Sequence, residues 1–238
     1  MKNYKVPMFL DVFSITKTSQ LETEQAIIQY LSKGAGGFNY KRCAKYCATI
    51  VKGHHSIESL VSQCKGNGES VALIQNSKVL EIVAPKLISL DSQVFNFPKQ
   101  TITLAPGIYS NLGPNFFFVE NGVVKIFYLH ARKSDRATKA DLAGLAWGFK
   151  KEILDNDFLG MKADVMLVDV DRLDETNPIV NMYSLDELLP ELIEAPEDTI
   201  IRFAKALRKV DEHKLAGEIK KGTKRSTEKD DNQLGFSF

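Results

Sequence analysis

The clearest secondary-structure signal in the hydrophobic and polar pattern lies near the middle of the chain. Residues 116–119 and 123–132 are two β-rich runs, separated by Glu120, Asn121 and Gly122. An Asn-Gly pair between such runs is the strongest short-range signal for a β-hairpin, because a type I′ turn needs positive φ at both central residues. The pattern therefore predicts a hairpin here, with its turn at Asn121 and Gly122.

A helix and a buried strand are predicted directly after this hairpin. Thr138 is a suitable N-cap for a helix that runs to about residue 154, with apolar residues on one face. Gly144 and Gly148 either weaken this helix or allow it to pack closely against another segment. Residues 163–170 form a mostly apolar run, which is typical of a strand that is covered on both faces.

Helices are predicted over most of the N-terminal part. Residues 7–15 alternate only loosely and are interpreted as a first strand. Residues 19–33 read as a helix, with Ser19 and Glu22 at capping-box spacing. Two more helices are expected at 39–51 and at 57–64, the second with Ser56 as its N-cap.

The remaining elements are short. Residues 71–83 are interpreted as two short strands that bend at Asn76 and Ser77, and residues 101–104 as another strand. Helices are predicted at 184–189 and from Pro196 to about residue 215. Beyond Gly217 the chain is polar and charged without periodicity, so disorder is expected there.

These elements predict an α+β protein with a mixed or antiparallel sheet, a β-β-α-β core, flanking helices and a disordered C-terminal tail. Three parts are expected: a mainly helical section at 1–66, an α+β core with C-terminal helices at 67–216, and the tail at 217–238. The order of elements does not decide whether the first section is a separate domain.

Composition indicates the cellular compartment in which the protein is expected. The chain has 238 residues, of which 44% are hydrophobic and 26% charged, as in ordinary globular proteins. Three cysteines without framework spacing favour reduced thiols in the cytoplasm. The N-terminus lacks the apolar core of a signal peptide, and no apolar run approaches the roughly 20 residues of a membrane span. Composition gives no oligomeric state.

Charge is nearly balanced in total, with 31 basic against 30 acidic residues, but it is distributed in blocks. Residues 40–65 and 125–139 are basic, whereas residues 141–198 are strongly acidic. The basic blocks either attract a polyanion or pair with the acidic block across the fold.

The second basic block contains the candidate ligand site. Free N–H groups and the helix dipole gather where a strand leads into a helix, so anions are often held there. The cations around the predicted junction point to phosphate or nucleic-acid binding. The candidate anion-binding residues are Lys125, His130, Arg132, Lys133, Arg136 and Lys139. Alternation places His130 and Arg132 on one face of the strand and Lys133 on the other.

The β-β-α-β order, hairpin 116–132, helix 138–154 and strand 163–170, resembles the core of PD-(D/E)xK nucleases. The resemblance covers about a quarter of the chain and concerns topology. In that family an acid precedes the lysine by two positions on the second hairpin strand, whereas this chain has Val123 before Lys125. The resemblance therefore implies a degenerate, inactive nuclease. A metal-dependent nuclease that uses Mg²⁺ is the alternative, with Glu120 or Asp169 as its acids.

Two further patterns offer other ligands. Cys43 and Cys47 share a helix face and, with Cys64 and His54 or His55, contain the ligand types of a zinc site. No cofactor is the main expectation, and zinc is the alternative. The helix pair around Gly53 also has the outline of a helix-turn-helix.

The tail ends in an apolar pattern. Its last residues are similar in outline to the short peptides with which bacterial proteins dock onto the replication sliding clamp. The candidate docking residues are Gln233, Leu234, Phe236 and Phe238. A terminus that merely packs against the body is the alternative.

These observations lead to one main functional hypothesis and a rival. We expect a nucleic-acid-associated accessory protein that contacts phosphates through the basic strand–helix junction and lacks nuclease activity. The rival is a protein-interaction module that meets its partner through the acidic segment or the tail. The partner is accordingly nucleic acid or another protein, and no membrane is expected.

Overall fold

The computed structural model describes residues 7–32, 39–53, 56–67, 69–88, 90–132, 137–172, 174 and 177–215, except for the side chains of 213–215. Within these residues the strands form a five-stranded mixed sheet in the order β1-β4-β5-β6-β7 and a separate two-stranded hairpin, β2-β3. The strands are β1 (Gln93–Phe95), β2 (Gln100–Ala105), β3 (Ile108–Leu112), β4 (Phe116–Glu120), β5 (Val123–His130), β6 (Ala163–Asp171) and β7 (Ile179–Tyr183).

The centre of the sheet confirms the predicted hairpin. Strands β4 and β5 pair antiparallel, and Asn121 and Gly122 at their turn have φ of 51° and 76°, as a type I′ turn requires. Strand β6 then lies parallel to β5, while β1 and β7 pair antiparallel at the two edges. The predicted α+β class with a mixed sheet is thus confirmed, and so is the β-β-α-β order of elements.

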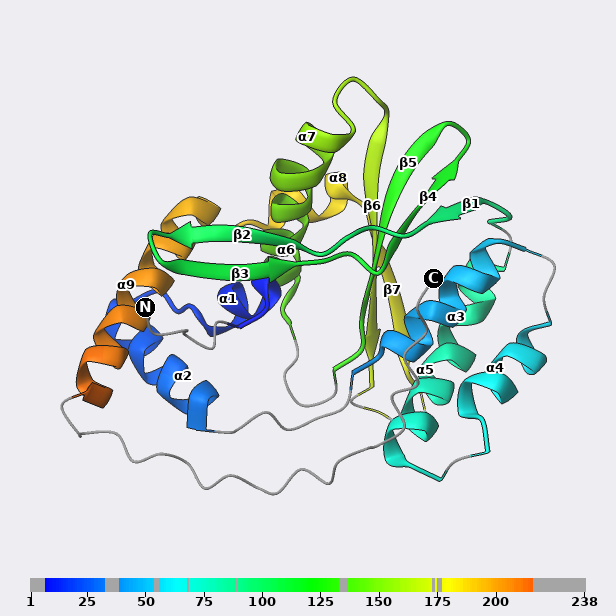
Figure 1. Cartoon of the computed structure of the whole chain (residues 1–238), viewed down its shortest axis with the longest axis horizontal. Helices are drawn as coiled ribbons and strands as arrows, with labels where there is room; N and C mark the ends of the chain where they lie inside the picture. The colour runs from blue at the N-terminus through cyan, green and yellow to red at the C-terminus, as the bar shows by residue number, and fades with distance from the viewer. Residues whose placement is uncertain are drawn as a thin grey trace.

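Helices cover both faces of this sheet (Figure 1). One face lies against α6, with α1, α2, α9 and the β2-β3 hairpin further out, and α3, α4 and α5 cover the other. The helices are α1 (Phe9–Ile15), α2 (Gln20–Ser32), α3 (Lys41–Val51), α4 (Ile57–Lys65), α5 (Val71–Leu87), α6 (Lys139–Phe149), α7 (Asp155–Asp157), α8 (Leu185–Leu188) and α9 (Pro196–Leu215), with a π-helical turn η1 (Lys150–Leu154) and a 3₁₀ turn η2 (Leu189–Glu191).

Glycines let α6 approach α1. A Cβ atom at Gly144 would lie 2.3 Å from a ring carbon of Phe13, and one at Gly148 would lie 2.1 Å from a ring carbon of Phe9. The two glycines therefore give the phenylalanine rings of α1 room to lie against the backbone of α6. This is the close packing that the sequence offered as one of two explanations.

Aromatic rings and thiols fill the opposite face. Phe116 and Phe127 stack with their centroids 4.4 Å apart, and both are buried beneath α3–α5. The amide of Asn76 joins two of these helices: its oxygen accepts from the Cys43 backbone at 2.8 Å, and its nitrogen donates to the Asn39 carbonyl at 3.0 Å. This buried polar side chain fixes α5 against the start of α3.

Three predicted strands are wrong, one at residues 7–15 and two within residues 71–83. Residues 7–15 contain α1 instead of a strand, because nearly every side chain of this helix is buried and no polar stripe marks one face. Residues 71–83 lie in the single helix α5, with Ser70 as its N-cap. Asn76 and Ser77 suggested a bend, but in the structure Asn76 bonds across to α3 and the Ser77 hydroxyl donates to the Ile74 carbonyl within the helix.

The other predicted elements are present, with ends shifted by a few residues. Thr138 caps α6 in a capping box with Asp141, and Ser56 caps α4. Strand β7 was not predicted; its residues are half-buried or exposed at the edge of the sheet and show no clear alternation.

Both hydrophobic clusters join residues from either side of the predicted boundary at residue 66. One extends from Phe9 to Val210, and the other from Cys43 to Val170. The division of the chain at residue 66 stays a prediction, and the tail at 217–238 lies outside the described residues. None of the helices in the described part is both long and apolar enough to cross a membrane.

Candidate functional site

The candidate site lies where the parallel strands β5 and β6 end. His130 is in register with Asp169, and the chain returns to this edge of the sheet at Thr138, where α6 begins. In open sheets of this kind, ligands commonly bind outside the carboxyl ends of parallel strands. Residues 133–136, which connect β5 to α6, lie outside the described residues.

His130 is the most enclosed polar side chain at this edge. Its Nδ1 lies 2.7 Å from Oδ1 of Asp169, and 4% of the side chain is exposed. Its other ring nitrogen, Nε2, is buried and has no hydrogen-bond partner among the described residues. When Nδ1 donates a hydrogen bond to the Asp169 carboxylate, Nε2 is the ring nitrogen left for a further hydrogen bond. It accepts that bond in the neutral imidazole and donates it in the imidazolium.

Arg132 continues the same face and pairs with a distant acid. Its guanidinium donates to Asp11 of α1, a carboxylate that is buried and also accepts from the Tyr30 hydroxyl at 3.2 Å. Burial opposes the charge of Arg132, but Asp11 outweighs this effect and the pKa of Arg132 is raised. Arg132 thus compensates a buried carboxylate and ties α1 to the end of β5.

Lys139 at the start of α6 is also paired. Its Nζ donates to Glu191 at 2.9 Å and lies 5.5 Å from the ring centroid of Tyr183. The hydrogen bond to Glu191 raises the pKa of Lys139. Burial, and then the nearby Asp169 carboxylate, raise the pKa of Tyr183, so this hydroxyl stays protonated at neutral pH.

Lys125 does not join this group. It lies near the start of β5, in register with Phe118, and its Nζ bonds Glu120 of the hairpin at 2.5 Å. Of the six predicted anion-binding residues, the structure brings His130, Arg132 and Lys139 to one edge and places Lys125 toward the other end of β5. Lys133 and Arg136 lie outside the described residues.

Arg172 is a buried cation that sequence reasoning missed. It follows β6, and its guanidinium donates to the Gln75 side chain at 2.7 Å, to the Ala131 carbonyl at 2.8 Å and to the Tyr40 hydroxyl. Its Nε is buried without a partner among the described residues. No single-sequence pattern marks this residue, since its partners come from three distant segments.

The cysteines show no sign of a metal centre in the part of the chain that is described. Cys43, Cys47 and Cys64 are fully buried, and no group of three metal-ligating side chains is found among the described residues. A hydrogen bond with Cys47 and burial raise the pKa of Cys43, and burial raises that of Cys64 to about 11. The three therefore pack as small apolar side chains. His54 and His55 lie outside the described residues.

One cation of the first basic block and many acids of the acidic block are engaged within the fold. Arg42 of the first basic block donates to the carbonyls of Cys64 and Gln63, at the end of α4. Many acids of the 141–198 block pair with a cation or with His130, or cap a backbone group. They are Asp141, Asp155, Asp164, Asp169, Glu187, Glu191, Glu194 and Glu197.

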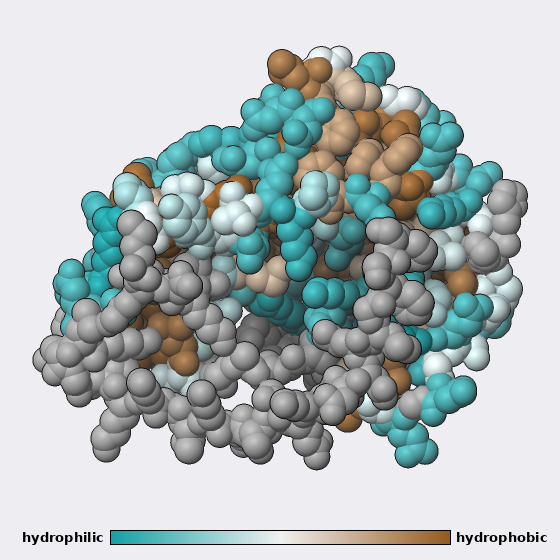
Figure 2. Space-filling model, viewed as in Figure 1, coloured by the Kyte–Doolittle hydropathy of each residue, from teal (hydrophilic) through white to brown (hydrophobic). Residues whose placement is uncertain are grey.

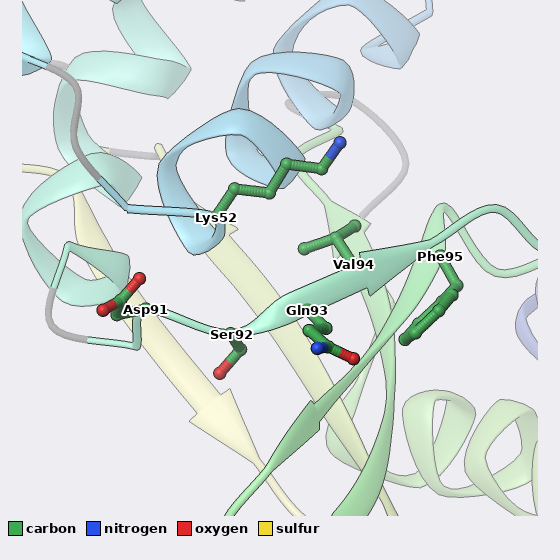
Figure 3. A pocket seen from close by; sticks show the side chains of 6 residues that line it. All are labelled: Lys52, Asp91, Ser92, Gln93, Val94 and Phe95. Carbon is green, nitrogen blue, oxygen red and sulfur yellow. The ribbon is translucent and has the colours of Figure 1, made fainter.

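A shallow groove of about 440 Å³ lies along edge strand β1, on the other side of the molecule from α9. Figure 3 shows Lys52 reaching from the end of α3 above Val94, with Phe95 at the far end of the strand. The groove is lined by Lys52, Asp91, Ser92, Gln93, Val94 and Phe95. Sequence reasoning did not single out this strand.

Comparison with known proteins adds no family to this description. No protein-family model matches the chain. Searches of curated proteins and of solved structures also gave no match. The resemblance to PD-(D/E)xK nucleases therefore remains one of element order, and the candidate site has to be judged on its own geometry.

Proposed function

We propose that the protein is a nucleic-acid-associated accessory protein that contacts backbone phosphates at the junction between β5 and α6. The observation that carries the proposal is the position of the basic residues at the shared carboxyl edge of β5 and β6, where α6 begins. Phosphates are favoured at such an edge because helix N–H groups and the helix dipole point toward it.

The basic residues at this edge differ in whether a carboxylate already engages them. Arg132 and Lys139 each contact a carboxylate, and His130 contacts Asp169, so these three side chains are held in fixed positions. In the proposal, Lys133 and Arg136 of the connecting residues supply the main phosphate contacts.

A nuclease reaction receives less support. The acid that the nuclease pattern requires before Lys125 is replaced by Val123, and the hairpin's Glu120 bonds Lys125. Asp169, the other candidate acid, bonds His130. We therefore propose a non-catalytic, nuclease-like protein. For the rival hypothesis, a protein-interaction module, the tail is the main remaining candidate for the binding surface, because many acids of the acidic segment have partners within the fold.

The test is nucleic-acid binding measured by fluorescence polarisation over a salt series, with duplex and single-stranded DNA and RNA. The informative variant is Lys133→Ala with Arg136→Ala, since changing Arg132 would leave Asp11 unpaired. Its salt slope on duplex DNA should be shallower by about 1.8, or about 0.9 for each lost phosphate contact.

The matched control is Lys86→Ala with Lys205→Ala, which removes the same charge from exposed positions on α5 and α9. Its salt slope should equal that of the parent. A parent protein that binds no nucleic acid at about 50 mM salt would overturn the function. Equal losses in both double variants would overturn the assignment to this junction.

A further inference from the structure

A stripe of lysines runs along the outer face of α3. Lys41, Lys45 and Lys52 are exposed, and Lys52, the C-cap, keeps helical dihedral angles of φ −69° and ψ −11°. At 3.6 residues per turn, the three positions lie within about 40° of one another around the helix axis. The buried Cys43 and Cys47 lie on the opposite side of the helix. The lysine stripe therefore faces away from the sheet.

The helix itself supplies no acid to neutralise this stripe. Helix α3 contains no aspartate or glutamate, and Arg42 is turned toward α4, where it donates to the Cys64 and Gln63 carbonyls. Figure 3 shows that the Lys52 side chain points away from Asp91, the acidic residue that lines the same groove. The surface between α7 and the β4-β5 hairpin is instead apolar (Figure 2). The lysine stripe is thus a local concentration of positive charge.

Arg172 holds the start of α3 against the end of β5. Its guanidinium donates to the Ala131 carbonyl at 2.8 Å and to the hydroxyl of Tyr40, the N-cap of α3. Ala131 lies two residues before Lys133, one of the proposed phosphate contacts. The lysine stripe therefore begins beside the junction between β5 and α6 and leads away from it along α3.

The start of α3 adds positive potential to that of the lysines. The N-terminal end of a helix dipole is positive, and the first turn of α3 has no acidic residue to compensate it. Among the described residues, the hydrogen-bond partners of the buried Arg172 are an amide, a carbonyl and a hydroxyl, and none is a carboxylate. This distribution of charge favours a ligand that carries a row of anions.

We propose that the lysine stripe extends the nucleic-acid contact of the β5-α6 junction, with Lys41, Lys45 and Lys52 following the phosphates of one strand of a duplex. Lys41 and Lys52 are eleven positions apart and thus about 17 Å apart along the helix axis. Phosphates of one strand recur about every 3.4 Å along the duplex axis, so the stripe spans about five of them. This inference rests on the proposed function and adds a second contact surface to it.

Fluorescence polarisation with duplex DNA over a salt series tests the stripe. Replacing Lys41, Lys45 and Lys52 together by alanine should make the salt slope shallower by about 2.7, or about 0.9 for each lysine. Between about 50 and 200 mM salt, the affinity of this stripe variant should then fall about 40-fold less than that of the parent. Because the three side chains are exposed, the midpoint of thermal unfolding should stay close to that of the parent.

The matched control removes the same charge from exposed positions elsewhere, with Lys99→Ala, Lys162→Ala and Lys205→Ala. Its salt slope should equal that of the parent. Equal changes of slope in the control and in the stripe variant would overturn the assignment to α3. Polyglutamate that competes as well as DNA at the same charge concentration would assign the stripe to an acidic protein segment, and would overturn nucleic acid as its ligand.

Combining the stripe variant with Lys133→Ala and Arg136→Ala tests whether both surfaces contact one duplex. The salt slope should then be shallower by about 4.5, and the parent should bind one duplex per molecule. Two duplexes per molecule would overturn the extended contact. A parent that binds no nucleic acid overturns the proposed function and this inference with it. Binding that the junction variant weakens and the stripe variant leaves unchanged overturns this inference alone.

Discussion

The face of the central sheet that α6 covers and the face that α3–α5 cover differ in both packing and polarity. On the α6 face, glycines admit the rings of Phe9 and Phe13, and hydrogen-bonded polar pairs lie at the carboxyl edge of the strands. On the α3–α5 face, stacked phenylalanines and buried thiols fill the space.

The polar groups next to the sheet that could contact a ligand therefore gather on its α6 side. Two pairs hold polar groups in place on the α6 side: Arg132, after β5, donates to Asp11 of α1, and His130 of β5 contacts Asp169 of β6. The α3–α5 side is mostly apolar, with Arg172 and Asn76 as its polar anchors. We therefore expect substitutions of buried residues on the α3–α5 side to affect stability alone. Substitutions at the carboxyl edge of the strands, on the α6 side, should also affect the proposed nucleic-acid binding.

The largest effect is expected from removing a ring on the α3–α5 face. Phe127→Ala deletes a fully buried ring that stacks on Phe116, and should lower the free energy of unfolding by about 3–5 kcal/mol. Urea denaturation measures this loss. Phe127→Leu keeps most of the volume and should cost clearly less, because the buried volume sets most of the loss. Equal losses in both variants would contradict this and would point to the stacked ring itself.

A smaller effect is expected from adding a methyl group on the α6 face. Gly148→Ala should lower the free energy of unfolding by about 1–3 kcal/mol, because the new Cβ meets Phe9, although alanine favours helices. The same urea experiment measures the loss. Phe9→Leu in the Gly148→Ala background should recover part of it; strictly additive losses would contradict the contact.

The smallest effect concerns the thiols. Burial raises the pKa of Cys64 from 9.0 to about 11, so the folded chain binds more protons than the unfolded chain between these values. Its stabilising contribution is full below about pH 9 and is lost as the pH rises toward 11. Cys64→Ala should therefore lose less stability than the parent between pH 9 and 11 in thermal unfolding. Parallel losses would contradict the shift.

The sequence predicted the centre of the fold because its signals there are local. Asn121 and Gly122 specify the turn by their own φ values, and Thr138 caps α6 through a residue three positions later. Helices α1 and α5 were misjudged because they are buried on several sides, which removes the polar stripe. The side chain that marked a bend, Asn76, bonds across to α3 instead.

The candidate site was predicted only in outline for the same reason. The cations around the junction are close in sequence, so their gathering at the end of β5 could be expected. Their partners Asp11, Asp169 and Glu191 lie up to 121 residues away along the chain, and only the folded arrangement brings them together. The groove beside β1 depends in the same way on α3, whose Val51 carbonyl accepts a hydrogen bond from the backbone of Ser92, just before the strand.

The packing of α9 against α1 and α2 has a consequence for synthesis of the chain. The cluster that contains Phe9 also contains Phe203 and Val210, so it closes only after almost all of the described residues have been made. At about 5–20 residues per second, the ribosome needs about 10–35 s between the end of α2 and Val210. During that time the apolar rings of α1 lack their final partners. A newly made chain of this protein should therefore depend on chaperones until α9 emerges.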